Sequence, residues 1–176
     1  IRIGDIMKQP IIKNKDSVIR AYVNCLYWIN NKFYDVESRN LGYISELQTQ
    51  ITYLLKAQII EFIVKNKDND EFMDTLGTYF KDKDDFFEST LNKFRKTNVN
   101  TSGYIELLIL SYIFKNYPII VYDNFQDTKY IFNSGPIKVT KENIEKFSNK
   151  EDLIQIQFEY EISNDIPNKI FSMYSF

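Results

Sequence analysis

The chain has 176 residues, which is enough for one domain whose hydrophobic core needs neither disulfides nor a metal. Hydrophobic residues make up 44% of it and charged residues 26%, a balance typical of globular rather than disordered proteins. The net charge is −2, and because acidic and basic residues are interspersed there is no basic stripe, so we expect no nucleic-acid partner.

Cysteine and histidine are nearly missing from the composition. Cys25 is the single cysteine, and the chain has no histidine. A lone cysteine excludes an intramolecular disulfide and favours a reducing compartment, so we expect an intracellular, cytoplasmic protein. Without a cluster of Cys and His we expect no zinc site, and no sequence feature calls for another metal or a cofactor.

The sequence shows neither a signal peptide nor a membrane-spanning segment. Its longest apolar stretch, residues 104–114, is too short to cross a bilayer and contains Glu106, so we expect no membrane partner. Because the chain begins at Ile1, we interpret it as part of a longer polypeptide or assembly. Its richness in Lys, Asn, Ile, Phe and Tyr is typical of an AT-rich genome, such as that of a virus, a protist or an intracellular bacterium. For a viral protein, host cytoplasm or virion is the expected location. We expect residues 1–15 to be a leader or linker, and residues 16–176 to form one domain.

Helical periodicity dominates the first two thirds of the chain, after Ile11 and Ile12, which are predicted to form a short edge strand. Ser45 and Gln48 have the spacing of a capping box, which predicts the start of a long helix. A polar loop is predicted at residues 97–102. The apolar spacing predicts helices over residues 21–33, 45–65, 72–80, 84–96 and 104–115.

The last third of the chain changes to strand-like patterns. Residues 133–136 predict a turn, Thr140 is predicted to cap a short helix ending near Phe147, and residues 164–168 predict a loop. Strands are predicted at residues 119–122, 129–132, 153–158 and 170–174. Together these elements predict an α+β fold in which a small mixed or antiparallel sheet is packed between helices.

One run of residues resembles a known family. Residues 105–111 read I-E-L-L-I-L-S after Gly103, and residues 118–122 read P-I-I-V-Y. This resembles a signature of the OTU (ovarian tumour domain) family of papain-like cysteine proteases, in which a Gly-rich turn, a helix of pattern I-E-L-x-x-L-S and a strand of pattern P-I-I-V-Y follow one another. The resemblance covers most of residues 21–174 and implies an OTU-like fold. Because the family mostly cleaves ubiquitin conjugates, it implies ubiquitin or a ubiquitin-like protein as a partner.

The resemblance also assigns the catalytic positions. Residues 24–27 resemble the motif D-G-N-C-L-F/Y at the start of a helix, which makes Cys25 the nucleophile position and Asn24 an oxyanion-loop position. Tyr22 then stands where the family has Asp, and Val23 where it has Gly.

The family's histidine lies near the end of the domain, in a motif of N-H-Y/W followed by a polar residue. Residues 168–172 match best, with Lys169 at the histidine position and Phe171 at that of the orienting residue. A shifted match would put Glu159 at the histidine position, and neither match offers an imidazole.

These departures bear directly on catalysis. A cysteine protease needs a thiolate, and histidine is the usual base because its pKa lies near the working pH. For Lys169 to act instead, its pKa would have to fall by about three units, at a cost of roughly 4 kcal/mol. We therefore predict a catalytically inactive OTU-like pseudoprotease that serves as a protein-binding or assembly module.

Two alternatives stay open at this point. The first is an active OTU-type cysteine protease, a deubiquitinase or a polyprotein-processing enzyme, with Cys25 as nucleophile and a base other than histidine. The second is a structural component of a virion or complex without any link to ubiquitin, which would expose an apolar patch among its many Phe and Tyr side chains.

Overall fold

The structure is a computed structural model, and it describes residues 7–9, 17–30, 41–77, 104–123, 128–163 and 166–175. Its helices are α1 (Ser17–Asn30), α2 (Leu41–Lys65), α3 (Asp70–Gly77), α6 (Tyr104–Ile113) and α7 (Lys141–Ser148). Its strands are β1 (Met7–Gln9), β2 (Ile119–Asp123), β3 (Thr128–Phe132), β4 (Pro136–Ile137), β5 (Ile154–Ser163) and β6 (Ile166–Ser175).

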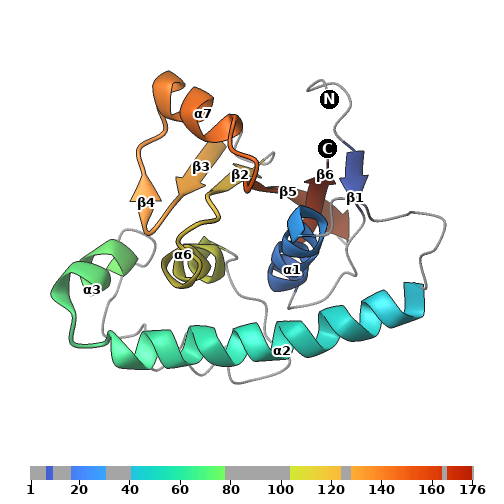
Figure 1. The fold of residues 1–176 in the computed structure, drawn as a ribbon, viewed down its shortest axis with the longest axis horizontal. Coiled ribbons are helices and arrows are strands. Elements are labelled where there is room, and N and C mark those ends of the chain that lie inside the picture. Colours follow the sequence, from blue (N-terminus) through green and yellow to red (C-terminus); the bar gives the residue numbers. More distant parts are fainter. Residues whose placement is uncertain are drawn as a thin grey trace.

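The strands form one mixed sheet. Its order is β1-β6-β5-β2-β3-β4. β2 and β5 run parallel, and every other neighbouring pair is antiparallel. Figure 1 shows α7 on one side of this sheet and α1 and α6 on the other, with α2 lying beneath both. The predicted α+β fold with a small mixed sheet packed between helices is therefore confirmed.

The larger core fills the space between the sheet and α1, α2, α3 and α6. Strands place alternate residues on opposite faces, and β2 and β5 contribute their isoleucine and valine side chains to this face at every second position. α6 is buried on almost every side, which explains why its sequence is continuously apolar rather than amphipathic. The buried side chains of this core include Val18, Ile19, Tyr22, Cys25, Leu55, Ile59, Ile63, Leu107, Leu108, Ile119, Val121, Ile154 and Ile156.

A smaller core lies under α7 on the opposite face. Ile120 of β2 and Ile131 of β3 pack there against Phe147 of α7 and against Leu153. α7 begins as its sequence predicts, because the Thr140 hydroxyl accepts a hydrogen bond from the Asn143 backbone N–H. β2 thus carries apolar residues on both faces, as befits a strand covered on both sides.

Several boundaries differ from the predictions. α1 begins at Ser17, four residues before the predicted start. α2 begins at Leu41, so the capping-box letters at Ser45 and Gln48 lie inside the helix, where both residue types are also tolerated. β6 begins at Ile166, and most of the loop predicted at residues 164–168 is therefore strand.

Other predictions fall at the edge of what the structure describes. The predicted edge strand at Ile11 and Ile12, the helix at 84–96 and the loop at 97–102 lie outside the described residues. Within the predicted leader, Met7–Gln9 forms β1 and pairs with β6, so this short segment belongs to the sheet. Among the described helices, none combines the length and apolar character needed to cross a bilayer.

Candidate functional site

Cys25 lies in the middle of α1 and not at its start. The helix begins eight residues earlier, so the positive end of the helix dipole is more than two turns away from the thiol. Cys25 is only 4% exposed and packs in the larger core. Its thiol donates a hydrogen bond to the Gln155 backbone oxygen of β5, with Sγ 3.6 Å from that oxygen.

The surroundings of Cys25 hold its thiol in the protonated form. Burial raises the pKa of Cys25 well above its ordinary value of 9.0, and the hydrogen bond with Gln155 only partly opposes this effect. A reactive cysteine needs the opposite conditions, namely exposure and nearby positive charge. The expectation that Cys25 sits at a helix start, where its thiolate would be favoured, is therefore wrong.

Tyr22, which stands at the position of the family's Asp, is likewise a core residue. It is fully buried, its ring lies 6.1 Å from that of Phe114, and its hydroxyl has no hydrogen-bond partner in the described part of the chain. Burial raises its pKa well above 10.0, and negative charge on Cys25 would raise it further. Tyr22 therefore packs the helix against the core instead of shaping a loop.

The backbone around Asn24 does not form an oxyanion site. An oxyanion hole needs N–H groups that have no intrahelical partner. Only the first four N–H groups of an α-helix are free in this sense, and Asn24 is the eighth residue of α1. The predicted oxyanion-loop position at Asn24 is therefore wrong for this helix.

The residue that does open α1 is Ser17. It is the first residue of the helix, eight residues before Cys25. The sequence carries a signal for this start, because Val18, Ile19 and Tyr22 continue the apolar spacing of Cys25 backwards by two turns. The run N-C-L-Y resembles the family motif, and it therefore suggested a helix start near Cys25 instead.

Lys169 lies far along the sheet from Cys25. The Cα register of β5 and β6 pairs Lys169 with Tyr160, and Phe171 with Phe158. Cys25 contacts β5 at Gln155, five residues before Tyr160 (160 − 155 = 5). At about 3.3 Å per strand residue this offset is about 17 Å, which a lysine side chain with four methylenes does not span. The structure thus does not bring together the two residues of the proposed dyad.

The signature run on α6 has a structural role that the sequence did not reveal. The Ser111 hydroxyl donates to the Leu108 backbone oxygen (2.6 Å) and accepts from the Gly135 backbone N–H (3.2 Å), while the Ser134 N–H donates to the Ser111 carbonyl (3.2 Å). These hydrogen bonds hold the turn between β3 and β4 against the end of α6.

The other end of α6 is fastened to the sheet as well. The Tyr104 hydroxyl donates to the buried Asp123 carboxylate at the end of β2, and the Tyr104 ring packs 4.7 Å from the ring of Tyr130 on β3. Contacts at both ends of the helix therefore hold α6 against the sheet, and Ser111 of the signature run makes those at one end.

Comparison with known proteins agrees with this fold. No protein-family model matches the chain. The chain is 29% identical over 174 residues to uncharacterized protein R327 of Acanthamoeba polyphaga mimivirus, in a match that covers 94% of this chain and 11% of that protein. The chain thus spans about a tenth of the length of the curated relative it matches.

A solved structure gives the clearer likeness. The crystal structure of an OTU deubiquitinase from Wolbachia pipientis wMel superposes with a TM-score of 0.61, covering 99% of this chain and 90% of that one, at 10% sequence identity. The chain therefore has an OTU-like fold, as the signature on α6 and β2 predicted, and it has a viral relative.

Proposed function

We propose that this chain is a catalytically inactive OTU-like domain that binds another protein, and that ubiquitin is the partner of first choice. The burial of Cys25 carries the proposal. This thiol is 4% exposed, it is bonded to a backbone oxygen, and its pKa is raised by burial. It is the one cysteine of a chain that has no histidine, so no other pair of residues supplies thiolate and imidazole.

Retention of the scaffold supports a binding role over mere decay. The contacts that hold α6 to β2 and to the turn between β3 and β4 are intact, although the chemical groups of a protease are absent. Ubiquitin is the partner of first choice because the similar solved structure is that of a deubiquitinase. An OTU-like fold alone does not specify a function, so the proposal depends on measurement.

The active-protease alternative has less support. It requires Cys25 to react and Lys169 to reach it, whereas the offset along β5 is about 17 Å. The alternative of a purely structural component remains distinct from our proposal, because it predicts no interaction with ubiquitin.

Two assays test the two halves of the proposal. Incubation with di-ubiquitin chains and with a cysteine-reactive ubiquitin probe should give neither cleavage nor a covalent adduct, and Cys25→Ala should behave as the unmodified chain does. Cleavage that is lost in Cys25→Ala would establish the active-protease alternative instead.

The binding half is tested by titrating unlabelled ubiquitin into the ¹⁵N-labelled chain. We expect amide shifts that saturate, and the same shifts in Cys25→Ala, because a buried thiol does not contribute to a surface. A chain that shows no shifts at millimolar ubiquitin would exclude ubiquitin as its partner and favour the structural alternative.

A further inference from the structure

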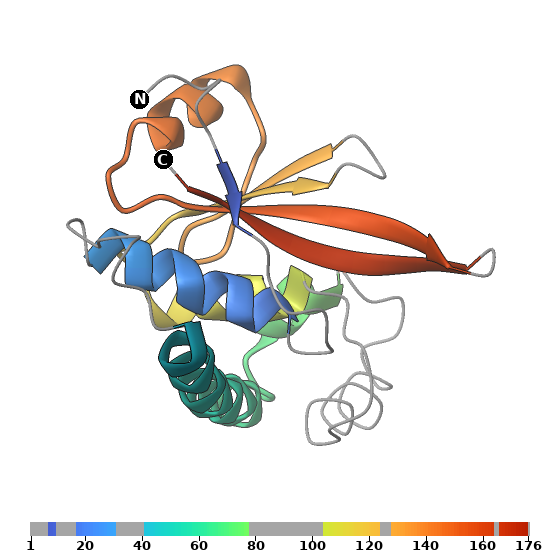
Figure 2. The same cartoon turned by 90° about the vertical axis from the view of Figure 1, so that its right-hand side faces the viewer.

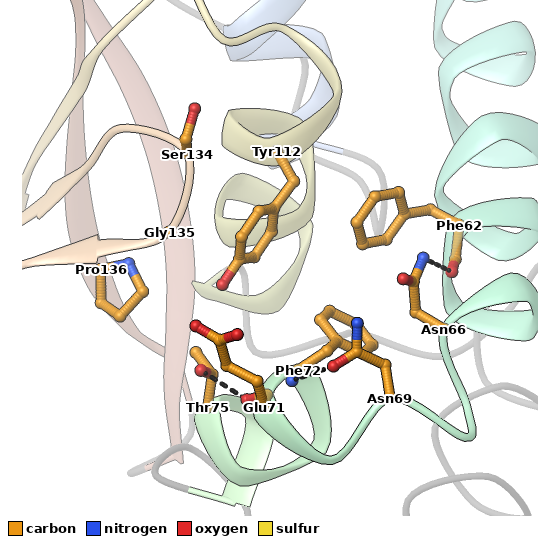
Figure 3. A pocket seen from close by; sticks show the side chains of 10 residues that line it. All are labelled: Phe62, Asn66, Asn69, Glu71, Phe72, Thr75, Tyr112, Ser134, Gly135 and Pro136. Carbon is orange, nitrogen blue, oxygen red and sulfur yellow. Dashed lines mark hydrogen bonds between the residues drawn. The ribbon is translucent and has the colours of Figure 1, made fainter.

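A pocket lies beside the turn that Ser111 holds, and neither Cys25 nor Tyr22 is among the residues that line it. It has a volume of about 420 Å³ and lies between the end of α2, α3, the end of α6 and the turn between β3 and β4 (Figure 3). None of the lining residues that the structure describes belongs to α1, β5 or β6. This volume is within the range of sites that take small ligands or single side chains.

Three aromatic rings form one wall of the pocket. Phe62 and Tyr112 are stacked with centroids 5.6 Å apart, and Phe72 meets both edge-on at 5.3 and 6.0 Å. Phe72 is buried, whereas Phe62 and Tyr112 are half-buried and are open to a ligand. The rings hold one another in place, so the wall exists before any ligand binds.

The polar groups of the pocket favour a cation. Among the described residues that line it, Glu71 is the one charged residue, and none is a lysine or arginine. Its carboxylate lies close enough to Tyr112 to add to the rise in the pKa of that hydroxyl, which burial raises most and the Thr75 hydroxyl partly opposes. Figure 3 shows the Tyr112 hydroxyl pointing from α6 toward Glu71 and Thr75.

The pocket offers a further acceptor besides this carboxylate. The Asn66 side-chain N–H donates to the Phe62 carbonyl (2.8 Å), which leaves its side-chain oxygen without a partner among the described residues. The Thr75 hydroxyl donates to the Glu71 backbone oxygen (2.9 Å) and also interacts with the Tyr112 hydroxyl. Lys65, the last residue of α2, is paired with Glu61 at 2.8 Å.

We propose that this pocket binds the guanidinium group of an arginine side chain presented by a partner protein. A guanidinium is planar and donates several N–H bonds in one plane, so it can stack on an aromatic ring and bind a carboxylate through two hydrogen bonds. Cations are stabilised within about 6 Å of an aromatic ring centroid. An ammonium group would satisfy the charge of Glu71 but not the stacking.

The surroundings favour an arginine that belongs to a protein over the free amino acid. Asn69, Glu71, Ser134 and Pro136 are exposed at the rim, so the rest of a ligand would lie on the surface. α3 adds Asp70 in its first turn, and a free amino acid would bring its own carboxylate toward this negative charge.

The test is a titration of the ¹⁵N-labelled chain with N-acetyl-arginine methylamide, followed by amide and side-chain shifts. We expect shifts at Gly135 and at the Asn66 and Asn69 side chains, with a Kd on the order of 1 mM, as for a single anchoring side chain. The matching lysine and citrulline derivatives should bind at least about fivefold more weakly, because they lack the planar fork or the charge.

Variants distinguish this site from general charge attraction. Glu71→Gln removes the charge and keeps the shape, and it should weaken binding about tenfold. Asp70→Asn makes the same charge change one residue away on α3, outside the lining, and should leave the Kd within about twofold. Both residues are exposed, so neither change threatens folding.

The other outcomes would overturn the proposal. Equal binding of citrulline and arginine derivatives, equal effects of the two variants, or no shifts at millimolar ligand would each exclude a guanidinium site. Tighter binding of free arginine than of the capped derivative would exclude a protein source for the ligand. None of these results depends on whether ubiquitin binds or whether Cys25 reacts.

Discussion

Cys25 illustrates how one residue type serves two opposite purposes. A catalytic cysteine and a core cysteine have the same letter, and the environment alone decides between them. Here the environment is the interior of α1 against β5, where the thiol behaves as a small apolar side chain with one weak hydrogen bond. The absence of histidine in the sequence pointed the same way before the structure did.

The raised pKa of Cys25 predicts how stability depends on pH. In the folded chain the thiol stays protonated, whereas in the unfolded chain it ionises near its ordinary pKa of 9.0. The pKa of the thiol is higher in the folded chain than in the unfolded chain. The contribution of the thiol to the free energy of unfolding is therefore constant below about pH 9, and it is lost as the pH rises further. The free energy of unfolding should then fall by about 1.4 kcal/mol per pH unit.

Urea unfolding of the wild type and of Cys25→Ala, measured between pH 7 and pH 10, checks this expectation. The variant should be less stable at pH 7 by about 1 kcal/mol, and the difference should shrink above pH 9 because alanine does not ionise. Parallel pH curves for the two proteins would show that the thiol is not protected by the fold.

At the scale of elements, the end of α6 is joined to the sheet through one hydroxyl. Ser111 satisfies the buried Gly135 N–H, in a turn where Ser134 and Gly135 both have positive φ (51° and 117°). A Cβ at residue 135 would lie 3.0 Å from the Tyr112 hydroxyl oxygen, so glycine is required there by both backbone and space.

Ser111→Ala should therefore lower the free energy of unfolding by about 1–3 kcal/mol, because the Gly135 N–H would remain buried without an acceptor. Asn149→Ala is the matched control: its side-chain N–H also donates to a backbone oxygen, that of Glu145, but at an exposed position, and its loss should cost less than about 0.5 kcal/mol. Urea denaturation compares the two variants. Equal losses would mean that the Ser111 bonds contribute no more than a surface bond.

The sequence predicted the elements around this junction better than their contacts. The helix from Tyr104, the strands at β2 and β3, the turn at residues 133–136 and the cap at Thr140 were all found from local signals. Local periodicity does not say which residues meet across the fold, so the Ser111 link remained hidden. The pocket that contains Glu71 could not be predicted for the same reason, since its residues come from separate elements of the fold.

The expectation that Asn24 and Cys25 lie at the start of a helix was wrong for a different reason. A short motif is matched by residue identity alone, and the match at N-C-L-Y lies inside α1 and not at its start. Val18 and Ile19, which continue the apolar spacing, already indicated an earlier start of the helix. Whether Lys169 lies near Cys25 depends on the register between β5 and β6, which the sequence does not specify.

At the scale of the molecule, β2 connects two cores. Ile119 and Val121 belong to the larger core, whereas Ile120 belongs to the smaller core with Phe147 of α7. Figure 2 shows α1 and α7 on opposite sides of the sheet. Loss of either core uncovers one face of this central strand. The two faces should therefore unfold as one cooperative unit, even though α7 has only eight residues.

Phe147→Ala tests this coupling across the sheet. Phe147 is 3% exposed, and removing its ring should cost about 3 kcal/mol, measured from urea unfolding. If unfolding is cooperative, the thiol of Cys25 on the other face becomes accessible only when the whole domain opens. Its labelling rate by a thiol reagent should then rise about 100-fold in the variant, since 1.4 kcal/mol corresponds to a factor of ten.

Val139→Ala, a change at a surface position 41% exposed near the same helix, should leave the labelling rate within about threefold. A fall in the urea midpoint of Phe147→Ala without faster labelling would show that the α7 face opens by itself and that β2 does not transmit the loss to the core around Cys25.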